Sequence, residues 1–566
     1  MYKASNNTNF VNDKVLDSIE SSIDMNSEEL FQLLEIPSSE DFGDYSIPCF
    51  KLAKVMKKSP KVIASEISSS LQKNPWIDRV EEVNGYVNIF INRVKYSHQT
   101  LEQTLSGTVL NELRTLGEGK KVVLEFSSPN IAKEFGIGHL RSSIIGNALS
   151  NLYSNCGFET IKINYLGDWG TQFGKLIYGF MRYGDEKKLE KEPIKHLHDI
   201  YVETNLKMTD SGELESKKIF KDLEEGDKNA LKLWVKFREF SLKEFMKVYD
   251  LLGIKFDKIE GESKYKDSVN DIVKALENKN LLVTSDDAQG VDLQNYNLGF
   301  VLVRKNDGTS IYASRDIAAA IDRHERFKFN KMIYEVGAEQ SLHFNQLFKV
   351  LGLLGYEWHN SLEHVKHGLY LGPDGKKLST RKGTSVNFMS IWNEVRYSVK
   401  QIYLSDKKEV DDKTLDTITR SAIIYADLKN YRVNDVIFNP ESMTSFQGNT
   451  GPYLLYSYAR ANSILEKLVE SMDERLLEVI PNNEEYQLLR AIGRFPQSLQ
   501  LGLLDNDPSK IAVYAYDLCK QFNYFYGHCP VIDDPKQNYR VSIIKAFKKN
   551  LSASLNILGI ETLDHM

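Results

Sequence analysis

KVVLEFSSPNIAKEFGIGHLRSS, residues 121–143 of the chain, is the stretch that decides the fold. Its first six residues, Lys121 to Phe126, are mostly apolar, which is typical of a buried strand. Turn residues and glycines follow, and apolar residues then recur at helical spacing from His139 to about Tyr153. A strand, a glycine-bearing loop and a helix in this order predict an α/β domain.

The same alternation of short strands and helices continues along the chain. Helical stretches such as Ile317–Arg326 separate the further strand candidates, which are Thr160–Asn164, Phe300–Arg304, Lys331–Val336 and His364–Gly368. Strands that alternate with helices favour parallel pairing, because a parallel neighbour needs a long crossover connection. We therefore predict one parallel sheet of the Rossmann type.

The regions on either side of this sheet differ from it in pattern. Residues 41–92 predict a small α+β domain, with a polar linker over residues 112–120. Residues 182–258 are rich in Lys and Glu at helical spacing and predict a helical insertion. Beyond Asp411 long amphipathic segments predict a helix bundle, for example Thr414–Asn430, Gly451–Ser471 and Ser509–Tyr526. We expect domains over residues 1–115, 116–400 and 401–566.

Composition excludes several classes of protein. The 566 residues carry a formal net charge of −6 and are 42% hydrophobic, which is ordinary for a globular protein. The four cysteines form no CxxC pair, so neither a zinc knuckle nor a disulfide framework is indicated. The chain has no long apolar run, and its N-terminus does not resemble a signal peptide. We expect a cytoplasmic protein with no tightly bound metal.

Two segments have the chemistry of a nucleotide site. The glycines Gly136 and Gly138 precede His139 at a helix start, where free N–H groups and a partial positive charge suit a phosphate. Residues 372–384, GPDGKKLSTRKGT, form a cationic and hydroxyl-rich loop that could counter charge as pyrophosphate leaves. Taken separately, the two segments could equally be a tight turn and a solvated basic loop.

Together the two segments resemble the HIGH and KMSKS signatures of class I aminoacyl-tRNA synthetases. Seven motifs in order resemble arginyl-tRNA synthetase in particular: EFSSPNIAK, GHLRSS, LGDWGTQFGKL, DGTSIYASRDIAAA, GAEQSLHF, KKLSTRKGT and GNTGPYLLYSYARANSIL. They span residues 125–465. The resemblance implies a class I Rossmann-type catalytic domain with a helical insertion, an N-terminal tRNA-binding module and a C-terminal all-α anticodon-binding bundle.

The resemblance also implies an arginine pocket. Glu125 would bind the α-ammonium group of the substrate, and Asp316 would pair with its guanidinium, whose planar fork of donors requires a planar acceptor. The other arginine-binding residues implied are Ser128, Asn130, His139, Tyr312 and Gln340. As alternatives for Asp316, a helix cap or a salt bridge with Arg315 stays open.

For ATP the resemblance implies binding by Lys133, Gly136, Gly138, His139, His343 and Lys377. The catalytic set that it implies is Lys133, His139, Lys377, Ser379, Arg381 and Lys382. The sequence departs from the family signatures in three places. Thr380 replaces the second lysine of KMSKS, and Lys133 is expected to replace that lysine's charge. Gly136 stands where the first HIGH histidine would be, and Glu134 where a proline is usual.

The implied activity is the ATP-dependent joining of L-arginine to the 3′ end of tRNA(Arg) in protein synthesis, with Mg²⁺ accompanying ATP and the protein acting as a monomer. Aromatic and cationic residues of the bundle suit unstacked anticodon bases. They are Tyr453, Tyr456 and Arg460, together with Tyr425, Tyr431, Arg432 and Tyr458. Because of Gly136, a catalytically weakened paralogue that binds tRNA or arginine as a regulatory protein is the alternative. A nucleotidyl-transferring enzyme that acts on another small acid is a further rival.

Overall fold

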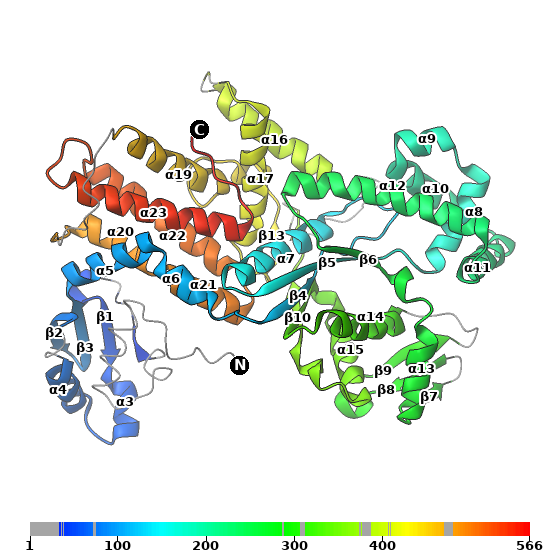
Figure 1. Ribbon diagram of the computed structural model, residues 1–566, viewed down its shortest axis with the longest axis horizontal. Helices are drawn as coiled ribbons and strands as arrows, with labels where there is room; N and C mark the ends of the chain where they lie inside the picture. The colour runs from blue at the N-terminus through cyan, green and yellow to red at the C-terminus, as the bar shows by residue number, and fades with distance from the viewer. Residues whose placement is uncertain are drawn as a thin grey trace.

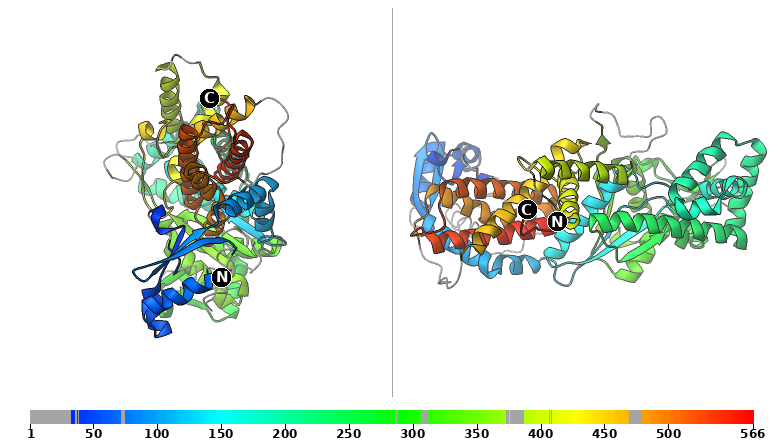
Figure 2. Two further views of the ribbon diagram at one scale, coloured as in Figure 1. Left: turned by 90° about the vertical axis from the view of Figure 1, so that its left-hand side faces the viewer. Right: turned by 90° about the horizontal axis from the view of Figure 1, so that it is seen from above.

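The computed structural model describes residues 33–566 except 36, 38, 72–74, 286–287, 306–311, 373–374, 376–386, 406, 408 and 469–478. The molecule is elongated: a helix bundle and a small N-terminal sheet lie at one end, and a helical insertion lies at the other (Figure 1). Seen from above, the central sheet lies between these two parts (Figure 2). None of the helices in the described part of the chain combines the length and the apolar composition that a membrane span requires.

The central sheet is parallel, as the sequence predicts. Among the described residues its strands lie in the order β11 (Leu362–His367), β10 (Lys331–Gly337), β4 (Lys121–Glu125), β5 (Glu159–Leu166) and β6 (Lys258–Gly261). The chain leaves β4 toward β5 on one side and returns later to β10 on its other side. Such a change of direction opens a crevice at the carboxyl end of the strands, where ligands bind in folds of this kind.

Successive residues of β4 face opposite layers. Val122 and Leu124 pack on the side of α7 (Ile137–Asn155), whereas Val123 packs on the side of α14 (Tyr312–Phe327) and α15 (Ser341–Leu354). Helix α7 approaches the sheet closely because Gly146 has no side chain. A Cβ atom at Gly146 would lie 2.2 Å from Cγ of Phe126.

One predicted strand belongs to a different sheet. Residues 300–304 do form a strand, β9 (Phe300–Lys305), but it pairs antiparallel with β8 (Ala288–Asp292), which in turn pairs with β7 (Leu282–Ser285). The prediction that this segment joins the parallel sheet is therefore wrong. Only residues 293–299 connect β8 and β9, too few for the crossover that parallel strands need. Conversely, β6 of the central sheet lies at the end of the segment predicted as helical.

The helical insertion consists of α8 (Thr171–Tyr183), α9 (Glu186–Lys191), α10 (Pro193–Leu206), α11 (Asp210–Glu224) and α12 (Lys228–Leu252). Asp168, directly after β5, ties α12 to the sheet. Its carbonyl accepts a hydrogen bond from Trp234 Nε1 at 2.7 Å, and its carboxylate accepts one from Arg238 Nε at 3.0 Å. The same carboxylate accepts from the backbone N–H of Ser263 at 2.9 Å, just beyond β6. Helix α13 (Val269–Asn278) follows.

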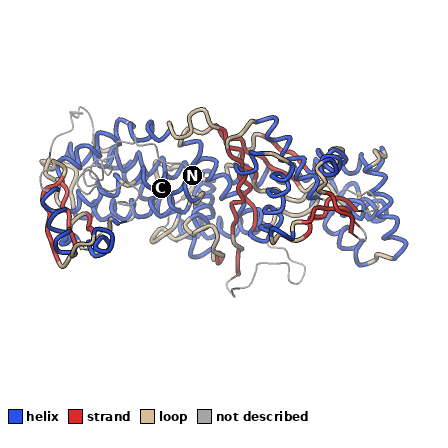
Figure 3. The backbone as a smooth tube through the Cα atoms, turned by 90° about the horizontal axis from the view of Figure 1, so that it is seen from below, coloured by secondary structure: helices blue, strands red, loops and turns tan. Residues whose placement is uncertain are grey.

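The N-terminal domain has the predicted α+β composition. Its antiparallel strands are β1 (Tyr45–Pro48), β2 (Ile77–Val83) and β3 (Tyr86–Ile91), packed with α3 (Cys49–Met56) and α4 (Pro60–Leu71). Figure 3 shows these strands at one end of the molecule, apart from the central sheet. Asp44 docks the domain on the bundle, because its Oδ1 accepts a hydrogen bond from Tyr486 at 3.1 Å and lies 3.4 Å from Arg490.

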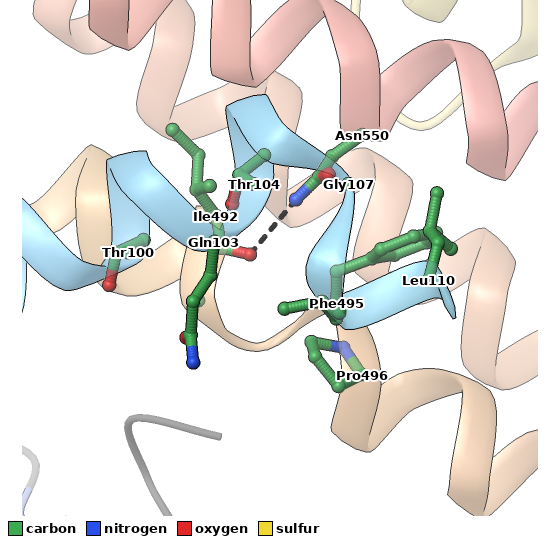
Figure 4. Close-up of a pocket in the computed structure, with 11 residues that line it drawn as sticks. Thr100, Gln103, Thr104, Gly107, Leu110, Ile492, Phe495, Pro496 and Asn550 are labelled. Atoms are coloured by element: carbon green, nitrogen blue, oxygen red, sulfur yellow. Dashed lines mark hydrogen bonds between the residues drawn. The ribbon is translucent and has the colours of Figure 1, made fainter. Parts of the chain in front are cut away.

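Helices α5 (Arg93–Ser106) and α6 (Thr108–Arg114) join this domain to the sheet, so the predicted linker starts inside α6. The C-terminal helices are α16 (Phe388–Ser405), α17 (Asp412–Leu428), α18 (Pro440–Met443), α19 (Gly451–Glu466), α20 (Asn483–Gly493), α21 (Phe495–Asp505), α22 (Ser509–His528) and α23 (Gln537–Leu558). Figure 4 shows a small cavity where α5 and α6 meet the bundle, bordered by Thr100, Phe495 and Asn550. The domain boundaries at residues 115 and 400 stay predictions.

Candidate active site

The loop after β4 holds an unusual backbone. Ser127, Ser128 and Ala132 have φ angles of 73°, 45° and 59°, in the left-handed region that residues with a Cβ seldom adopt. Hydrogen bonds to neighbouring helices hold the loop: Ser127 N–H donates to Ser142 Oγ and Ala132 N–H to Ser241 Oγ, both at 2.8 Å. Such conformations cost about 1–3 kcal/mol each and persist where the surroundings enforce them, often at functional sites.

His139 lies in the first turn of α7, directly beside this loop. Its Nδ1 donates a hydrogen bond to the carbonyl of Ser127 at 3.0 Å. Burial lowers the pKa of His139, and the hydrogen bond to Ser127 opposes this effect. The positive charges of Lys133 and His367 lower the pKa further. The imidazole is therefore neutral at neutral pH, and its Nε2, which carries no proton, can accept a hydrogen bond.

Gly136 is the N-cap of α7, and a side chain would fit there. Its φ of −80° suits any residue, and a Cβ atom at this position would have no neighbour within 4 Å among the described residues. Gly136 forms a bridge with Asn387, and Phe388 N–H donates to the carbonyl of Phe135 at 3.1 Å. The start of α7 therefore lies beside the residues that follow the second signature.

Some predicted residues lie outside the described residues, and three others are exposed. Lys377, Ser379, Arg381 and Lys382 lie outside the described residues, and so does the side chain of Tyr312, the first residue of α14. Lys133 is exposed on the loop between β4 and α7, Gly138 is exposed in the first turn of α7, and Gln340 is exposed at the N-cap of α15.

Glu125 ends β4 at the crevice and is 5% exposed. Its carboxylate forms an ion pair with the buried Arg323 on α14. Burial raises the pKa of Glu125, an effect that the Arg323 charge opposes. The guanidinium of Arg323 also lies over the ring of Tyr165, 4.6 Å from its centroid. A carboxylate and a guanidinium thus already face each other at the end of the central strand.

Asp316 lies one turn beyond the start of α14, and His343 Nε2 donates a hydrogen bond to its Oδ2 at 2.7 Å. The neighbouring Arg315 donates instead to Glu262 Oε2, from Nε at 3.0 Å and from Nη2 at 2.7 Å. Burial is the main cause that raises the pKa of Glu262 to about 7. The negative charges of Asp316 and Asp168 contribute to this rise, and the positive charge of Arg315 opposes it only in part. We call Glu125, Glu262, Asp316, Arg315, Arg323 and His343 the carboxylate pocket.

Polar atoms without partners point to a ligand in this region. Ser128 Oγ and the Tyr165 hydroxyl are buried and have no hydrogen-bond partner among the described residues. Buried polar groups normally have a hydrogen-bond partner, so a buried polar atom without one indicates a missing partner. Asn130 lies close by: its Oδ1 would be 2.1 Å from a Cβ atom on Gly167, so the glycine of LGDWG makes room for it. The structure brings Glu125, Ser128, Asn130 and Asp316 to one end of the sheet.

Sequence reasoning missed three residues of the carboxylate pocket: Arg323, Glu262 and Arg315, the last of which entered only as a possible partner of Asp316. Arg323 follows Asp316 by seven residues, two helical turns, so helical spacing could have placed both on one side of α14. Glu262 had no such signal, because the short strand β6 before it was not recognised. Among the described residues no group of three or more His, Cys, Asp or Glu side chains could hold a metal ion.

The bundle carries an exposed cluster of aromatic rings and a cation. The guanidinium of Arg460 lies 4.6 Å from the ring centroid of Tyr456 and 5.1 Å from that of Tyr526. Tyr456 and Tyr526 are 38% and 45% exposed. We call Tyr456, Arg460 and Tyr526 the aromatic patch. Tyr453 stands beside it, because its hydroxyl accepts a hydrogen bond at 2.9 Å from Asn523, which also binds Arg460.

Other aromatic residues predicted for RNA contact serve the core instead. Tyr425 is fully buried and donates a hydrogen bond to Asn449 at 2.6 Å, and Tyr458 is 7% exposed. Arg432 uses its guanidinium to hold the carbonyls of Lys366, Asp505 and Asn506. The prediction that Tyr425 and Tyr458 face RNA is wrong, because tyrosines at helical spacing also build the interior of a bundle. For Arg432, which is half-buried, it stays a prediction. Tyr431 is exposed.

Comparison with known proteins agrees with this geometry over the whole chain. The family model for "tRNA synthetases class I (R), catalytic domain" matches residues 100–440, that for "DALR anticodon binding domain" residues 454–566, and that for "Arginyl tRNA synthetase N terminal domain" residues 9–91. The second of these models covers the helices that carry the aromatic patch.

Individual relatives agree with the family models. Arginine–tRNA ligase 1 of Bacillus thuringiensis subsp. konkukian is 40% identical, covering 96% of this chain and 97% of the relative. Arginine–tRNA ligase of Clostridium perfringens is also 40% identical, covering 98% and 99%. The crystal structure of arginyl-tRNA synthetase from Plasmodium falciparum superposes with a TM-score of 0.80 at 26% identity, covering 98% of each chain. With its carboxylates at the switch point of a parallel sheet and its three matched regions in order, this chain belongs to the arginyl-tRNA synthetase family of class I enzymes.

Proposed function

We propose that the chain activates L-arginine with ATP and transfers it to the 3′ end of tRNA(Arg). The observation that carries the proposal is the carboxylate pocket at the end of β4 beside the start of α7. Acidic side chains from three separate elements meet there, which suits a substrate with two cationic groups. Family membership supplies the ATP-dependent ligase chemistry.

Arginine recognition would use the two ends of the pocket. Glu125 would bind the α-ammonium group, with Ser128 and Asn130 as neutral partners. Asp316 would receive the guanidinium. Glu262 binds Arg315, and its pKa is raised by burial and by the nearby charge of Asp316, which supports a second carboxylate close to that group. Tyr312 and Gln340 remain further candidates from the sequence. His343 was predicted on the ATP side, but its hydrogen bond to Asp316 supports a role in orienting that carboxylate.

ATP would lie along the start of α7. Gly136, Gly138 and the helix N-terminus would face its phosphates, because N-terminal N–H groups favour anions. Lys133 and Lys377 would supply countercharge, with Ser379, Arg381 and Lys382 on the second signature. Magnesium would enter with ATP and neutralise part of the phosphate charge. His139, held neutral by its burial, offers Nε2 as an acceptor on the same side.

The reaction then takes two steps. A carboxylate oxygen of arginine attacks the α-phosphorus of ATP, forming arginyl-adenylate as the bond to the leaving pyrophosphate breaks. A hydroxyl of the terminal ribose of the tRNA next attacks the arginyl carbonyl carbon, AMP leaves, and the hydroxyl proton is lost. The protein contributes by orienting reactants and by placing positive charge where negative charge develops. The aromatic patch supports binding of anticodon bases, and the N-terminal domain a further contact with tRNA.

The test is charging of total tRNA with labelled arginine by the purified protein, beside a Gly136→His variant. We expect charging by the parent chain. We expect the variant to fold with unchanged stability, since no described residue would lie within 4 Å of a Cβ atom at Gly136. We expect it to activate arginine faster, since a donor to a developing charge contributes about 2.7–4 kcal/mol. Charging by the variant alone would favour the paralogue that binds tRNA or arginine without turnover. No charging by either protein would refute the proposal.

A further inference from the structure

Arg141 lies on α7, two residues beyond His139, and is completely buried. Its Nε lies 3.4 Å from Oδ1 of Asp427, which belongs to α17 of the bundle. Its Nη1 donates to the carbonyl of Leu369 and its Nη2 to that of Arg432, each at 3.2 Å. One guanidinium therefore joins the helix of the candidate active site to two segments beyond the central sheet.

The other oxygen of Asp427 extends the connection. It accepts a hydrogen bond from the hydroxyl of Tyr370, the first residue of β12 (Tyr370–Leu371). Strand β12 pairs with β13 (Val436–Ile437) next to the bundle and not with the central sheet. Leu369 N–H also donates to Asp435 at 2.6 Å. The segment around Tyr370 is thus fixed to the C-terminal part of the chain.

On the side of α7, serines connect the same helix to the loop after β4. Ser142 Oγ donates to the carbonyl of Glu335 at 2.9 Å and accepts from Ser127 N–H. Ser143 Oγ lies 2.8 Å from Ser127 Oγ and donates to the carbonyl of His139 at 2.6 Å. A movement of α7 relative to the bundle would therefore displace both His139 and Ser127.

The ion pair between Arg141 and Asp427 is expected to add little to the stability of the fold. Arg141 and Asp427 both have side chains only 1% exposed, and burying two charges costs about as much as their attraction returns. Burial raises the pKa of Asp427, and Arg141 and Tyr370 act against that rise. Buried ion pairs that join separate elements are better suited to fixing one relative position than to adding stability.

We propose that Arg141 and Asp427 are positioning residues for aminoacylation, which hold the start of α7 and strand β12 at a fixed place on the C-terminal bundle. The inference rests on the proposed function, because one tRNA must contact the bundle and reach the active site together. A misplacement of about 1 Å between groups that must meet can cost about 100-fold in rate.

The test uses Asp427→Asn, which keeps the shape and removes the charge, and Tyr370→Phe, which removes one hydroxyl and keeps the ring. Glu485→Gln is the matched control. Glu485 is a buried bundle carboxylate that pairs with Arg540 at 2.7 Å, and its hydrogen-bond partners lie within residues 482–540. All variants are assayed well below the lowest Tm, for aminoacylation kcat, for KM of arginine and ATP, and for Kd of tRNA.

We expect Asp427→Asn to lower kcat about 10- to 100-fold, with KM of arginine and ATP and Kd of tRNA within about twofold. Tyr370→Phe should lower kcat less, and Glu485→Gln should change only Tm. Equal kcat values for Asp427→Asn and Glu485→Gln would overturn the inference.

Amide hydrogen exchange of residues 137–145 and 366–372 is measured on the same proteins. Asp427→Asn, or Tyr370→Phe if the first variant does not fold, should raise exchange in both segments, while Glu485→Gln should not. This readout needs no catalysis, so it decides the anchoring even if the parent chain fails to charge tRNA. Unchanged exchange in both segments would overturn the inference in that case as well.

Discussion

The carboxylate pocket and the aromatic patch are assembled in opposite ways. The pocket takes side chains from β4, from the turn after β6, from α14 and from α15, and its Glu125 and Arg323 meet although they are 198 positions apart in the sequence. The patch takes Tyr456, Arg460 and Tyr526 from two neighbouring helices, α19 and α22. In the pocket Glu125, Arg315 and Arg323 are buried and the other three residues are half-buried, whereas Tyr456 and Tyr526 of the patch are more exposed.

Because of this difference, we expect the two regions to respond differently to amino-acid substitutions. Charges in the pocket lie in a medium of low polarity, so each affects the pKa of its neighbours, as the raised pKa of Glu262 shows. The rings and the guanidinium in the patch are partly exposed to water, so we expect each stacking contact to contribute separately. Substitutions should therefore have steep and coupled effects in the pocket and shallow, nearly additive effects in the patch.

The largest effect is expected for Asp316→Asn. Removing one partner of a buried charge pair in a complex costs about 2–5 kcal/mol, so kcat/KM for arginine should fall at least about 30-fold. KM for ATP should stay within about twofold. The control is Asp322→Asn on the same helix, where the carboxylate pairs with Lys264 and Arg326 near the surface. Steady-state kinetics showing similar losses for both variants would remove Asp316 from the substrate site.

A smaller effect is expected for Arg460→Met in the patch. Loss of stacking of about 1–3 kcal/mol should raise KM for tRNA about 10-fold, while KM for arginine stays unchanged. Lys349→Met is the matched control, because Lys349 lies 3.5 Å from the ring centroid of Tyr296, far from the bundle in sequence. Charging assays at varied tRNA concentration measure both. A change in KM for arginine, with KM for tRNA unaltered, would contradict the division between the two regions.

The smallest effect is expected from pH. With a pKa of about 7, Glu262 gains its charge as pH rises, so KM for arginine should fall a few-fold between about pH 6 and pH 8. The raised folded pKa also means that stability from Glu262 is present below about pH 4.5 and is lost as pH rises through about 7. Glu262→Gln should abolish both trends.

Glu260→Gln serves as the control for this pH dependence. Burial alone would raise the pKa of Glu260, but hydrogen bonds from Arg326 and Lys264 lower it, so this group is charged throughout the same range. The Glu260→Gln variant should therefore keep the pH dependence of the parent in both KM and Tm. Loss of that dependence in both variants would mean that a shared structural change, and not the charge on Glu262, determines it.

Local patterns predicted the elements that carry the site. The predicted strand over residues 121–126, the predicted helix from His139 and the predicted helical stretch Ile317–Arg326 correspond to β4, α7 and α14, because the period of a contiguous run reveals its type. The same patterns were wrong about residues 300–304, because an apolar run predicts a strand and not its partner. Pairing depends on the length of the connection and on the layer that the strand covers.

The sequence by itself determined the order of strand, loop and helix and the family, and it pointed to Glu125, Asp316 and His343 of the carboxylate pocket, since these lie in contiguous motifs. Only the tertiary structure decided that Arg323 and Glu262 share that pocket, that Tyr526 completes the aromatic patch and that Tyr425 belongs to the core. The physical reason is that charge coupling and burial depend on distance in space. Residues far apart in the chain acquire that proximity only when the layers pack.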